Sequence, residues 1–131
     1  MIALDTNVLV RYFAQDDARQ SALATQLIEE RLSAADKGYV SLVVLLETVW
    51  VMQSCYDADA STVVDILADL LDTTTIEVQD TPAVRRAFGH FSDGTTDLHD
   101  CLIAALAEQR NARVVTFDAK AAKRLGMELL R

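Results

Sequence analysis

Short apolar segments alternate with longer helical ones along the whole chain, and this alternation limits the fold more than any other feature of the sequence. Strands separated by helices predict a parallel sheet with helices on both faces. We therefore expect the α/β class, with one domain over residues 1–131 built on a central, twisted parallel sheet. The expected strands are residues 1–4, 39–41, 75–78, 113–117 and 127–130.

The intervening segments carry the spacing of apolar residues that is typical of helices. The segment 42–52 is rich in β-branched residues but long enough to be helical, and Gly38 is expected to end the helix before it. Pro82 suits the first turn of a helix that runs towards His90. The other expected helices are 6–13, 17–34, 61–71, 97–110 and 119–125.

Composition excludes several classes of protein. No apolar run approaches the roughly 20 residues that span a bilayer, and no signal segment precedes the first strand, so we expect a cytoplasmic protein without membrane contact. The net charge of −8 argues against general electrostatic binding of nucleic acid, so that phosphate binding would have to be local. Cys55 and Cys101 are far apart and are expected to be reduced and packed as small apolar side chains.

Two aspartates come directly after apolar strands in the chain. Asp5 follows the first strand, and Asp118 follows the strand "VVTF". Each could instead cap the helix that comes after it, by accepting hydrogen bonds from free backbone N–H groups near the positive end of the helix dipole. Taken alone, each aspartate fits a helix cap better than a chemical role.

Asp97 and Asp100 open the helix that contains the apolar run 101–107, and they resemble a capping box. That helix has little polar surface, which places it in the middle of the protein with its acidic start at a cleft. Carboxylates at positions i and i+3 lie on one side of a helix and repel each other unless a cation separates them. Capping and metal binding are both open for this pair.

Glu47 is the single charged residue between Leu42 and Met52. Burial of such a carboxylate costs several kcal/mol unless it is paired or binds a metal. The alternative is that Glu47 faces solvent from an edge helix.

These acids are expected to converge, because the carboxyl ends of parallel strands meet at the edge of a sheet where ligands bind. A cluster of carboxylates without His or Cys suits Mg²⁺ or Mn²⁺ better than zinc. Two such cations about 3.5–4 Å apart can hold a phosphodiester, activate water and stabilise the leaving oxygen. The pattern therefore favours phosphodiester hydrolysis.

Four motifs in order resemble the PIN-domain ribonucleases, and among them the VapC-like toxins of toxin–antitoxin pairs. They are "LDTNVLV", the lone Glu47 in an apolar helix after a short strand, "DLHDCLIAALA" and "VVTFD". The resemblance covers nearly the whole chain and implies a metal-dependent endoribonuclease. It also implies an RNA substrate, a cognate antitoxin that blocks the cleft, and a homodimer.

The resemblance assigns roles residue by residue. Asp5, Glu47, Asp100 and Asp118 would be catalytic, and the same four with Asp97 would bind Mg²⁺ or Mn²⁺. Supporting roles would fall to Thr6 and Asn7, which would position Asp5, and to Thr116, which would hold Asp118 by a hydrogen bond.

Other interpretations stay open. The chain could be a PIN-fold module that binds proteins without catalysis, although its acidic set is complete. It could also be a Mg²⁺-dependent phosphatase or phosphotransfer domain with Asp5 as the nucleophile, but "MIA" before Asp5 lacks the acidic pair of a receiver. His99 fits a surface role better than a metal ligand. The basic residues Lys120, Lys123 and Arg124 fit a solvated helix face, or contacts to RNA phosphates.

Overall fold

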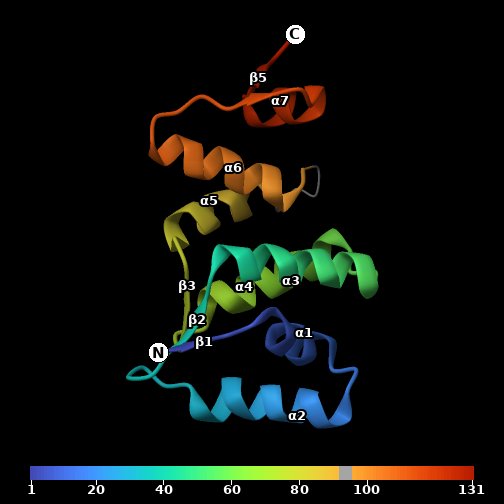
Figure 1. The fold of residues 1–131 in the computed structure, drawn as a ribbon, viewed down its shortest axis with the longest axis vertical. Helices are drawn as coiled ribbons and strands as arrows, with labels where there is room; N and C mark the ends of the chain where they lie inside the picture. The colour runs from blue at the N-terminus through green and yellow to red at the C-terminus, as the bar shows by residue number, and fades with distance from the viewer. Residues whose placement is uncertain (92–95) are drawn as a thin grey trace. The chain divides into compact units, whose positions relative to one another are not determined.

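The computed structural model describes residues 1–91 and 96–131. By its internal contacts the chain divides into two compact units, Met1–Gln79 and Asp80–Arg131 (Figure 1). Each unit has a parallel sheet of its own and helices that connect the strands.

The first unit contains a three-stranded parallel sheet in the order β1-β2-β3. The strands are β1 (Ile2–Ala3), β2 (Gly38–Val40) and β3 (Ile76–Val78). In the register Ala3 lies opposite Tyr39, and Leu4 N–H donates to the Tyr39 carbonyl at 2.9 Å. This pairing holds the end of β1 in place directly before Asp5.

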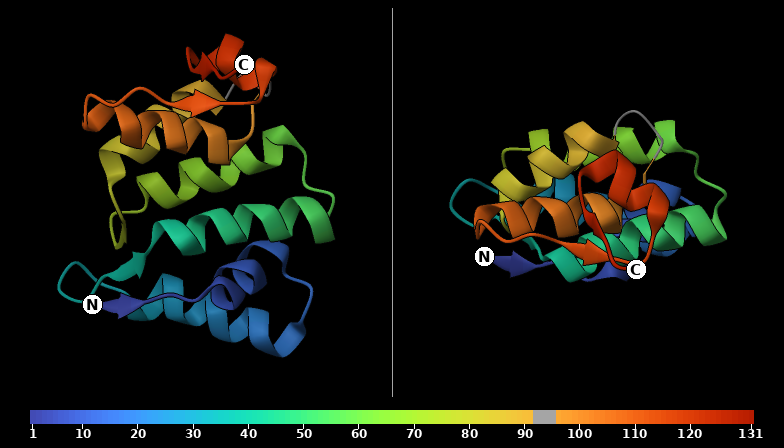
Figure 2. Two further views of the ribbon diagram at one scale, coloured as in Figure 1. Left: turned by 45° about the horizontal axis from the view of Figure 1, so that its top comes forward. Right: turned by 90° about the horizontal axis from the view of Figure 1, so that it is seen from above.

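Helices connect these strands and supply most of the core of the first unit. They are α1 (Thr6–Ala14), α2 (Ala18–Gln26), the π-helical turn η1 (Leu27–Arg31), α3 (Leu42–Cys55) and α4 (Ala60–Asp72). α1 packs against both α2 and α3, and α4 packs against β3 (Figures 1 and 2). Leu9, Leu45 and Leu67 are fully buried between them.

The helix expected over residues 17–34 ends earlier than the sequence indicates. The chain leaves η1 at Leu32, whose backbone is extended, and Ser33 and Asp36 then close a tight turn in which both Ser33 Oγ and its carbonyl accept from Asp36 N–H. Gly38 does not end that helix but begins β2. A Cβ atom there would lie 2.8 Å from Leu32 Cδ1 and 3.1 Å from Leu4 Cδ1, so glycine allows these two side chains to pack against the strand.

α3 is helical as expected, in spite of its β-branched residues. The Ser41 hydroxyl caps it by accepting from Val44 N–H at 3.2 Å, and Thr48 Oγ1 donates to the Val44 carbonyl at 2.7 Å. Leu45, Val49 and Met52 are buried along one side. Capping and tertiary packing therefore outweigh the modest helix propensity of the segment.

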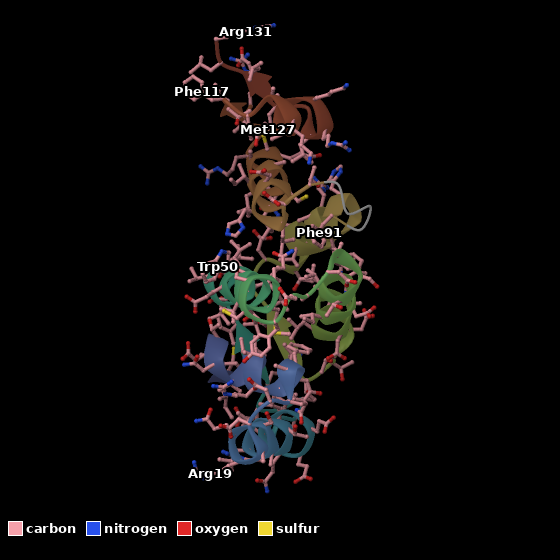
Figure 3. All side chains as sticks on the ribbon, turned by 90° about the vertical axis from the view of Figure 1, so that its right-hand side faces the viewer. Arg19, Trp50, Phe91, Phe117, Met127 and Arg131 are labelled. Atoms are coloured by element: carbon pink, nitrogen blue, oxygen red, sulfur yellow. The ribbon has the colours of Figure 1, made fainter. Side chains whose placement is uncertain are left out.

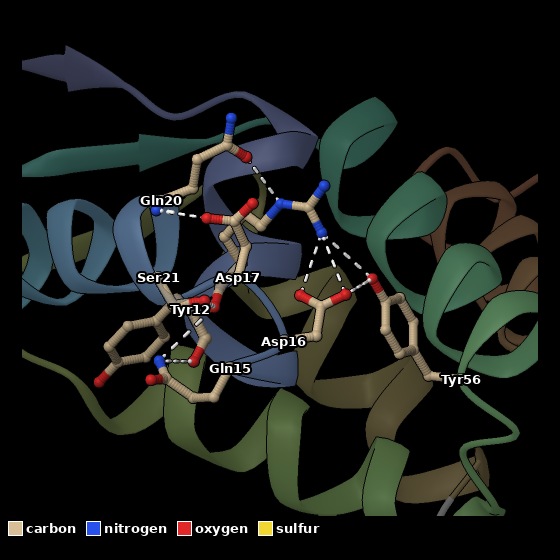
Figure 4. A network of polar contacts seen from close by, with 8 residues as sticks. Tyr12, Gln15, Asp16, Asp17, Gln20, Ser21 and Tyr56 are labelled. Carbon is tan, nitrogen blue, oxygen red and sulfur yellow. Dashed lines mark hydrogen bonds and ion pairs between the residues drawn. The ribbon is translucent and has the colours of Figure 1, made fainter.

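A polar network ties the connection between α1 and α2 to the end of α3 (Figure 4). Arg11 Nη1 forms an ion pair with Asp16 at 3.0 Å, and Arg11 Nε donates to Gln20 Oε1 at 2.8 Å. The Tyr56 hydroxyl also donates to Asp16, which lowers the pKa of that carboxyl and raises the pKa of Tyr56. The network holds α1 and α2 in a fixed arrangement.

The second unit pairs two helices and two short strands. α5 (Thr81–Phe91) and α6 (Leu98–Gln109) lie side by side (Figures 1 and 2). β4 (Val115–Thr116) and β5 (Glu128–Leu129) run parallel on either side of α7 (Ala119–Leu125) in the chain. The core of this unit consists of Ala83, Val84, Ala87, Phe91, Leu98, Cys101, Leu102, Ala105, Ala121 and Met127.

The α/β class and the parallel pairing of strands are confirmed. In the described ranges the strands form two sheets, of three and of two strands.

Cys101 is buried as expected, but Cys55 is exposed, because it lies in the last turn of α3 beyond the packed segment. None of the helices described here is both long and apolar enough to cross a bilayer. The single domain over residues 1–131 stays a prediction.

Candidate metal centre

Asp5 stands between β1 and α1, where its backbone begins the helix. Its carbonyl accepts from Val8 N–H at 3.1 Å. Its carboxylate is exposed, and within the described chain it makes no capping hydrogen bond to α1. Asp5 therefore occupies the cap position without using its side chain as a cap.

Other residues at the same kind of position do use their side chains. Asp17 accepts from Gln20 N–H at 2.8 Å at the start of α2, and Asp59 accepts from Thr62 N–H at 2.8 Å at the start of α4. Ser41 caps α3 in the same way. The capping interpretation is thus wrong for Asp5, and its charge is available for another purpose.

Asp97 repeats the arrangement of Asp5 in the second unit. Its carbonyl accepts from Cys101 N–H at 3.1 Å to begin α6, but among the described residues its carboxylate makes no capping bond. Asp100 lies in the first turn of the same helix and is half-buried. The capping-box interpretation of this pair is therefore not supported at Asp97.

Asp118 does cap its helix. One carboxylate oxygen, Oδ1, accepts from Lys120 N–H at 2.9 Å and from Ala121 N–H at 3.1 Å. Thr116 Oγ1 accepts from the backbone N–H of Asp118 at 3.0 Å, so Thr116 supports the backbone of Asp118 rather than its carboxylate. Since both capping bonds go to Oδ1, Oδ2 remains available for a cation.

The carboxyl group of Asp100 lies in an acidic environment. Partial burial raises its pKa, and the charges of Asp97 and Asp118 raise it further, while His99 acts weakly in the opposite direction. A cation near these three carboxylates would relieve their repulsion. The donor set is therefore chemically suited to a hard divalent ion.

The acidic side chains of the described chain repel one another, but they do not lie close enough together to bind one metal ion without rearrangement. In the parts of the chain that the structure describes, no three Asp, Glu, His or Cys side chains lie close enough together to hold one ion. The acids of the second unit thus influence one another electrostatically without forming a preassembled set of ligands.

Glu47 lies in the middle of α3 and is exposed. Because Glu47 is not buried, its carboxylate needs no partner or metal to offset a cost of burial. The alternative, that Glu47 faces solvent, is confirmed. Val43 and Trp50 lie on the same side of the helix, four residues before and three after Glu47, and are 76% and 58% exposed. Glu47 is thus a single carboxylate within an exposed apolar strip.

The remaining candidates differ in their surroundings. Thr6 is buried in the first turn of α1, whereas Asn7 is exposed. The described contacts include no hydrogen bond from either side chain to the Asp5 carboxylate. His99 is exposed, in keeping with a surface role.

Two features of the structure could not be read from the sequence pattern. Phe117 is 79% exposed beside Asp118, although the apolar run "VVTF" suggests a buried strand. A groove of about 410 Å³ lies between α1 and α2. Its lining residues are Asn7, Val8, Arg11, Gln20, Leu23, Ala24, Gln26, Leu27 and Arg31.

Replacement of Asp100 should separate repulsion from metal binding. Because the folded-state pKa of Asp100 is raised, its ionisation costs stability as pH rises above the ordinary carboxyl range near pH 4. Without metal at neutral pH, Asp100→Asn should unfold at a slightly higher urea concentration than the wild-type protein. Its free energy of unfolding should be larger by less than about 1 kcal/mol, and this difference should disappear below about pH 4. With Mn²⁺ the wild-type protein should be the more stable of the two, because only the wild-type protein is stabilised by binding the metal. Equal stabilisation of both proteins by Mn²⁺ would contradict a role of Asp100 in the metal site.

Comparisons with known proteins found one curated relative and one protein family. A VapC ribonuclease from Aquifex aeolicus (strain VF5) is 23% identical over 128 residues, which are 98% of this chain and 94% of that protein. No solved structure gives a significant match. The family model of the PIN domain matches residues 2–126, from β1 to the end of α7. The match includes every acid considered above, and the chain belongs to the PIN domain family.

Proposed function

We propose that this chain is a metal-dependent endoribonuclease and acts in the cytoplasm as the toxin of a toxin–antitoxin pair. Membership of the PIN domain family and the similarity to a VapC ribonuclease support a nuclease. The proposal assigns the catalytic role to Asp5, Glu47, Asp100 and Asp118. Asp97 joins them as a metal ligand.

One observation supports the assignment of Asp5 and Asp97. Asp5 and Asp97 occupy helix-start positions at which Asp17 and Asp59 make capping bonds, yet their carboxylates make none within the described chain. A carboxylate that gives up a cap loses about 1 kcal/mol of helix stabilisation. A function other than capping accounts for this loss.

The donors fit Mg²⁺ or Mn²⁺, because they are carboxylate oxygens without a thiolate or imidazole among them. Such an ion, when bound, supplies charge stabilisation for the phosphodiester and acidifies water. The protein positions the carboxylates for this role. Thr116 and the backbone of α7 fix Asp118, and the pairing of β1 with β2 fixes the position of Asp5.

The proposal is tested by incubating purified protein with end-labelled total RNA in Mg²⁺, in Mn²⁺ and in EDTA. We expect discrete products with either metal and none with EDTA. Absence of products from folded protein under all three conditions would contradict the nuclease and favour a PIN-fold module that binds proteins.

The groove between α1 and α2 is a suitable surface for an antitoxin segment. Leu23 is 51% exposed there, and Val8 and Leu27 extend the apolar surface. Asn7, two residues after Asp5, lines the same groove. A segment bound in it would therefore lie beside a proposed metal ligand, where it could block access of RNA.

Leu23→Asp should weaken binding of the cognate antitoxin, because it places a charge in the apolar part of the groove beside Val8 and Leu27. Since Leu23 is exposed, folding should be unaffected. We expect at least about a tenfold loss of affinity by calorimetry, equal to about 1.4 kcal/mol. Ala22→Asp is the matched control, since Ala22 is exposed on the same helix and does not line the groove. An unchanged affinity of Leu23→Asp would exclude this groove as the docking surface.

We also propose a homodimer, which the exposed Trp50 near the end of α3 supports. A second copy would cover Trp50 from the side of the helix end, so that Glu47, one turn before it, stays accessible. Light scattering at high micromolar concentration should give twice the mass of one chain, and Trp50→Asp should lower it. A monomeric wild-type protein would contradict the dimer.

A further inference from the structure

Phe117 is the most exposed large apolar side chain in the described part of the molecule, at 79% (Figure 3). Leaving a phenyl ring in water forgoes about 1.5–3 kcal/mol of burial energy. The core of the second unit is built without it, from α5, α6, Ala121 and Met127. Its exposure therefore points to a role in binding rather than in folding.

The backbone at Phe117 is fixed by hydrogen bonds of its two neighbours. Thr116 Oγ1 accepts from Asp118 N–H at 3.0 Å, which closes a turn around Phe117. Asp118 in turn accepts from the first N–H groups of α7. These bonds fix the backbone at Phe117, one residue before a proposed catalytic carboxylate, and leave the exposed ring free to rotate onto a bound base.

A basic surface begins on the other side of Asp118. Lys120, Lys123 and Arg124 are all exposed on α7. Positions 120, 123 and 124 share one side of the helix, because they are spaced by three and four residues. Within the described residues none of the three takes part in an ion pair, whereas Arg86 and Arg113 do.

An exposed aromatic ring beside a row of cations is the combination by which proteins bind single-stranded nucleic acid. Bases stack on the ring, and the phosphates contact the cations. The net charge of −8 makes this local concentration of positive charge more distinctive. Val115 and Leu130, each 49% exposed, lie near Phe117, since Leu130 N–H donates to the Thr116 carbonyl at 2.8 Å, and a protein partner would use this apolar surface. The row of cations on α7 favours RNA over such a partner.

We propose that Phe117 stacks on a base next to the scissile phosphate of a single-stranded RNA, and that Lys120 and Arg124 contact the neighbouring phosphates. This inference rests on the proposed ribonuclease function and names the residues that position its substrate. Phe117 is thus a positioning residue, not a catalytic one.

The test measures binding without cleavage. The probe is a fluorescein-labelled 2′-O-methyl oligoadenylate in EDTA at low salt, followed by fluorescence anisotropy. Phe117→Leu should bind it about tenfold or more weakly, because leucine keeps the apolar surface but removes the ring. Phe117→Trp should bind at least as tightly as wild type. Lys120→Ala should reduce the slope of log affinity against log salt by about 0.7, as expected for one phosphate contact to a single strand.

A second measurement detects stacking directly. In a Trp50→Phe, Phe117→Trp protein the new indole is the single tryptophan, since the chain has one Trp. Its fluorescence should be quenched when the oligoadenylate binds. Circular dichroism should show that all variants fold as the wild type does.

Three outcomes would overturn the inference, and they differ in what else they affect. If Phe117→Leu binds as wild type while Lys120→Ala is weakened, stacking is wrong but the proposed ribonuclease stands. If Phe117→Leu lowers the mass measured by light scattering instead of the affinity for the oligonucleotide, Phe117 belongs to a protein interface. If wild-type protein does not bind the probe, the stacking role fails, and cleavage of total RNA then decides separately whether the ribonuclease proposal also fails.

Discussion

Asp5→Asn is expected to slow metal-dependent RNA cleavage by at least about a thousandfold, because a lost ligand removes several kcal/mol of charge stabilisation from the transition state. Stability should change by less than about 0.5 kcal/mol, since the Asp5 carboxylate is exposed and makes no capping bond in the described structure. The measurements are the initial rate on end-labelled RNA with Mn²⁺ and the urea midpoint.

Asp59→Ala is the matched control. Asp59 also begins a helix of the first unit, but its carboxylate caps that helix. Its removal should cost about 1 kcal/mol of stability and leave the cleavage rate unchanged. The assignment of Asp5 would be refuted if Asp5→Asn cut RNA at the wild-type rate, or if it lost as much stability as Asp59→Ala.

Replacement of Asp118 is expected to affect both the cleavage rate and the stability, because its carboxylate caps α7 and is also a proposed metal ligand. Asp118→Asn keeps a good capping group but not the charge, whereas Asp118→Ala loses both. Each variant should slow cleavage by at least about a thousandfold. Only the alanine variant should also lose the capping contribution of about 1 kcal/mol in urea unfolding. Wild-type activity in Asp118→Asn would reduce Asp118 to a structural cap.

Much of the fold could be predicted, because local signals and periodicity agree in most segments. Ser41 before the run 42–52 marks the start of α3, and the burial of Leu45, Val49 and Met52 completes the helix. The end of the second helix could not be placed from its composition. It depends on a π-helical turn and on the hydrogen bonds between Ser33 and Asp36, which apolar spacing does not reveal.

The candidate acids could be selected from the sequence, but their local contacts could not be predicted, and their role as a site stays a prediction. Asp5 and Asp118 stand in equivalent places, after a strand and before a helix, yet one carboxylate caps and the other does not. The choice depends on the side-chain rotamer, which the sequence does not specify. Likewise the exposure of Glu47 depends on which segments pack against α3, and a lone charge in an apolar helix cannot indicate that.

The most direct test is the binding of Mn²⁺ to metal-free protein by calorimetry, because Asp5 and Asp100 are both proposed as metal ligands. We compare the wild-type protein with Asp5→Asn, Asp100→Asn and the capping control Asp59→Ala. We expect the first two variants each to weaken Mn²⁺ binding by at least about tenfold and the control to bind as wild type. Unchanged Mn²⁺ binding in both Asp5→Asn and Asp100→Asn would contradict this proposal.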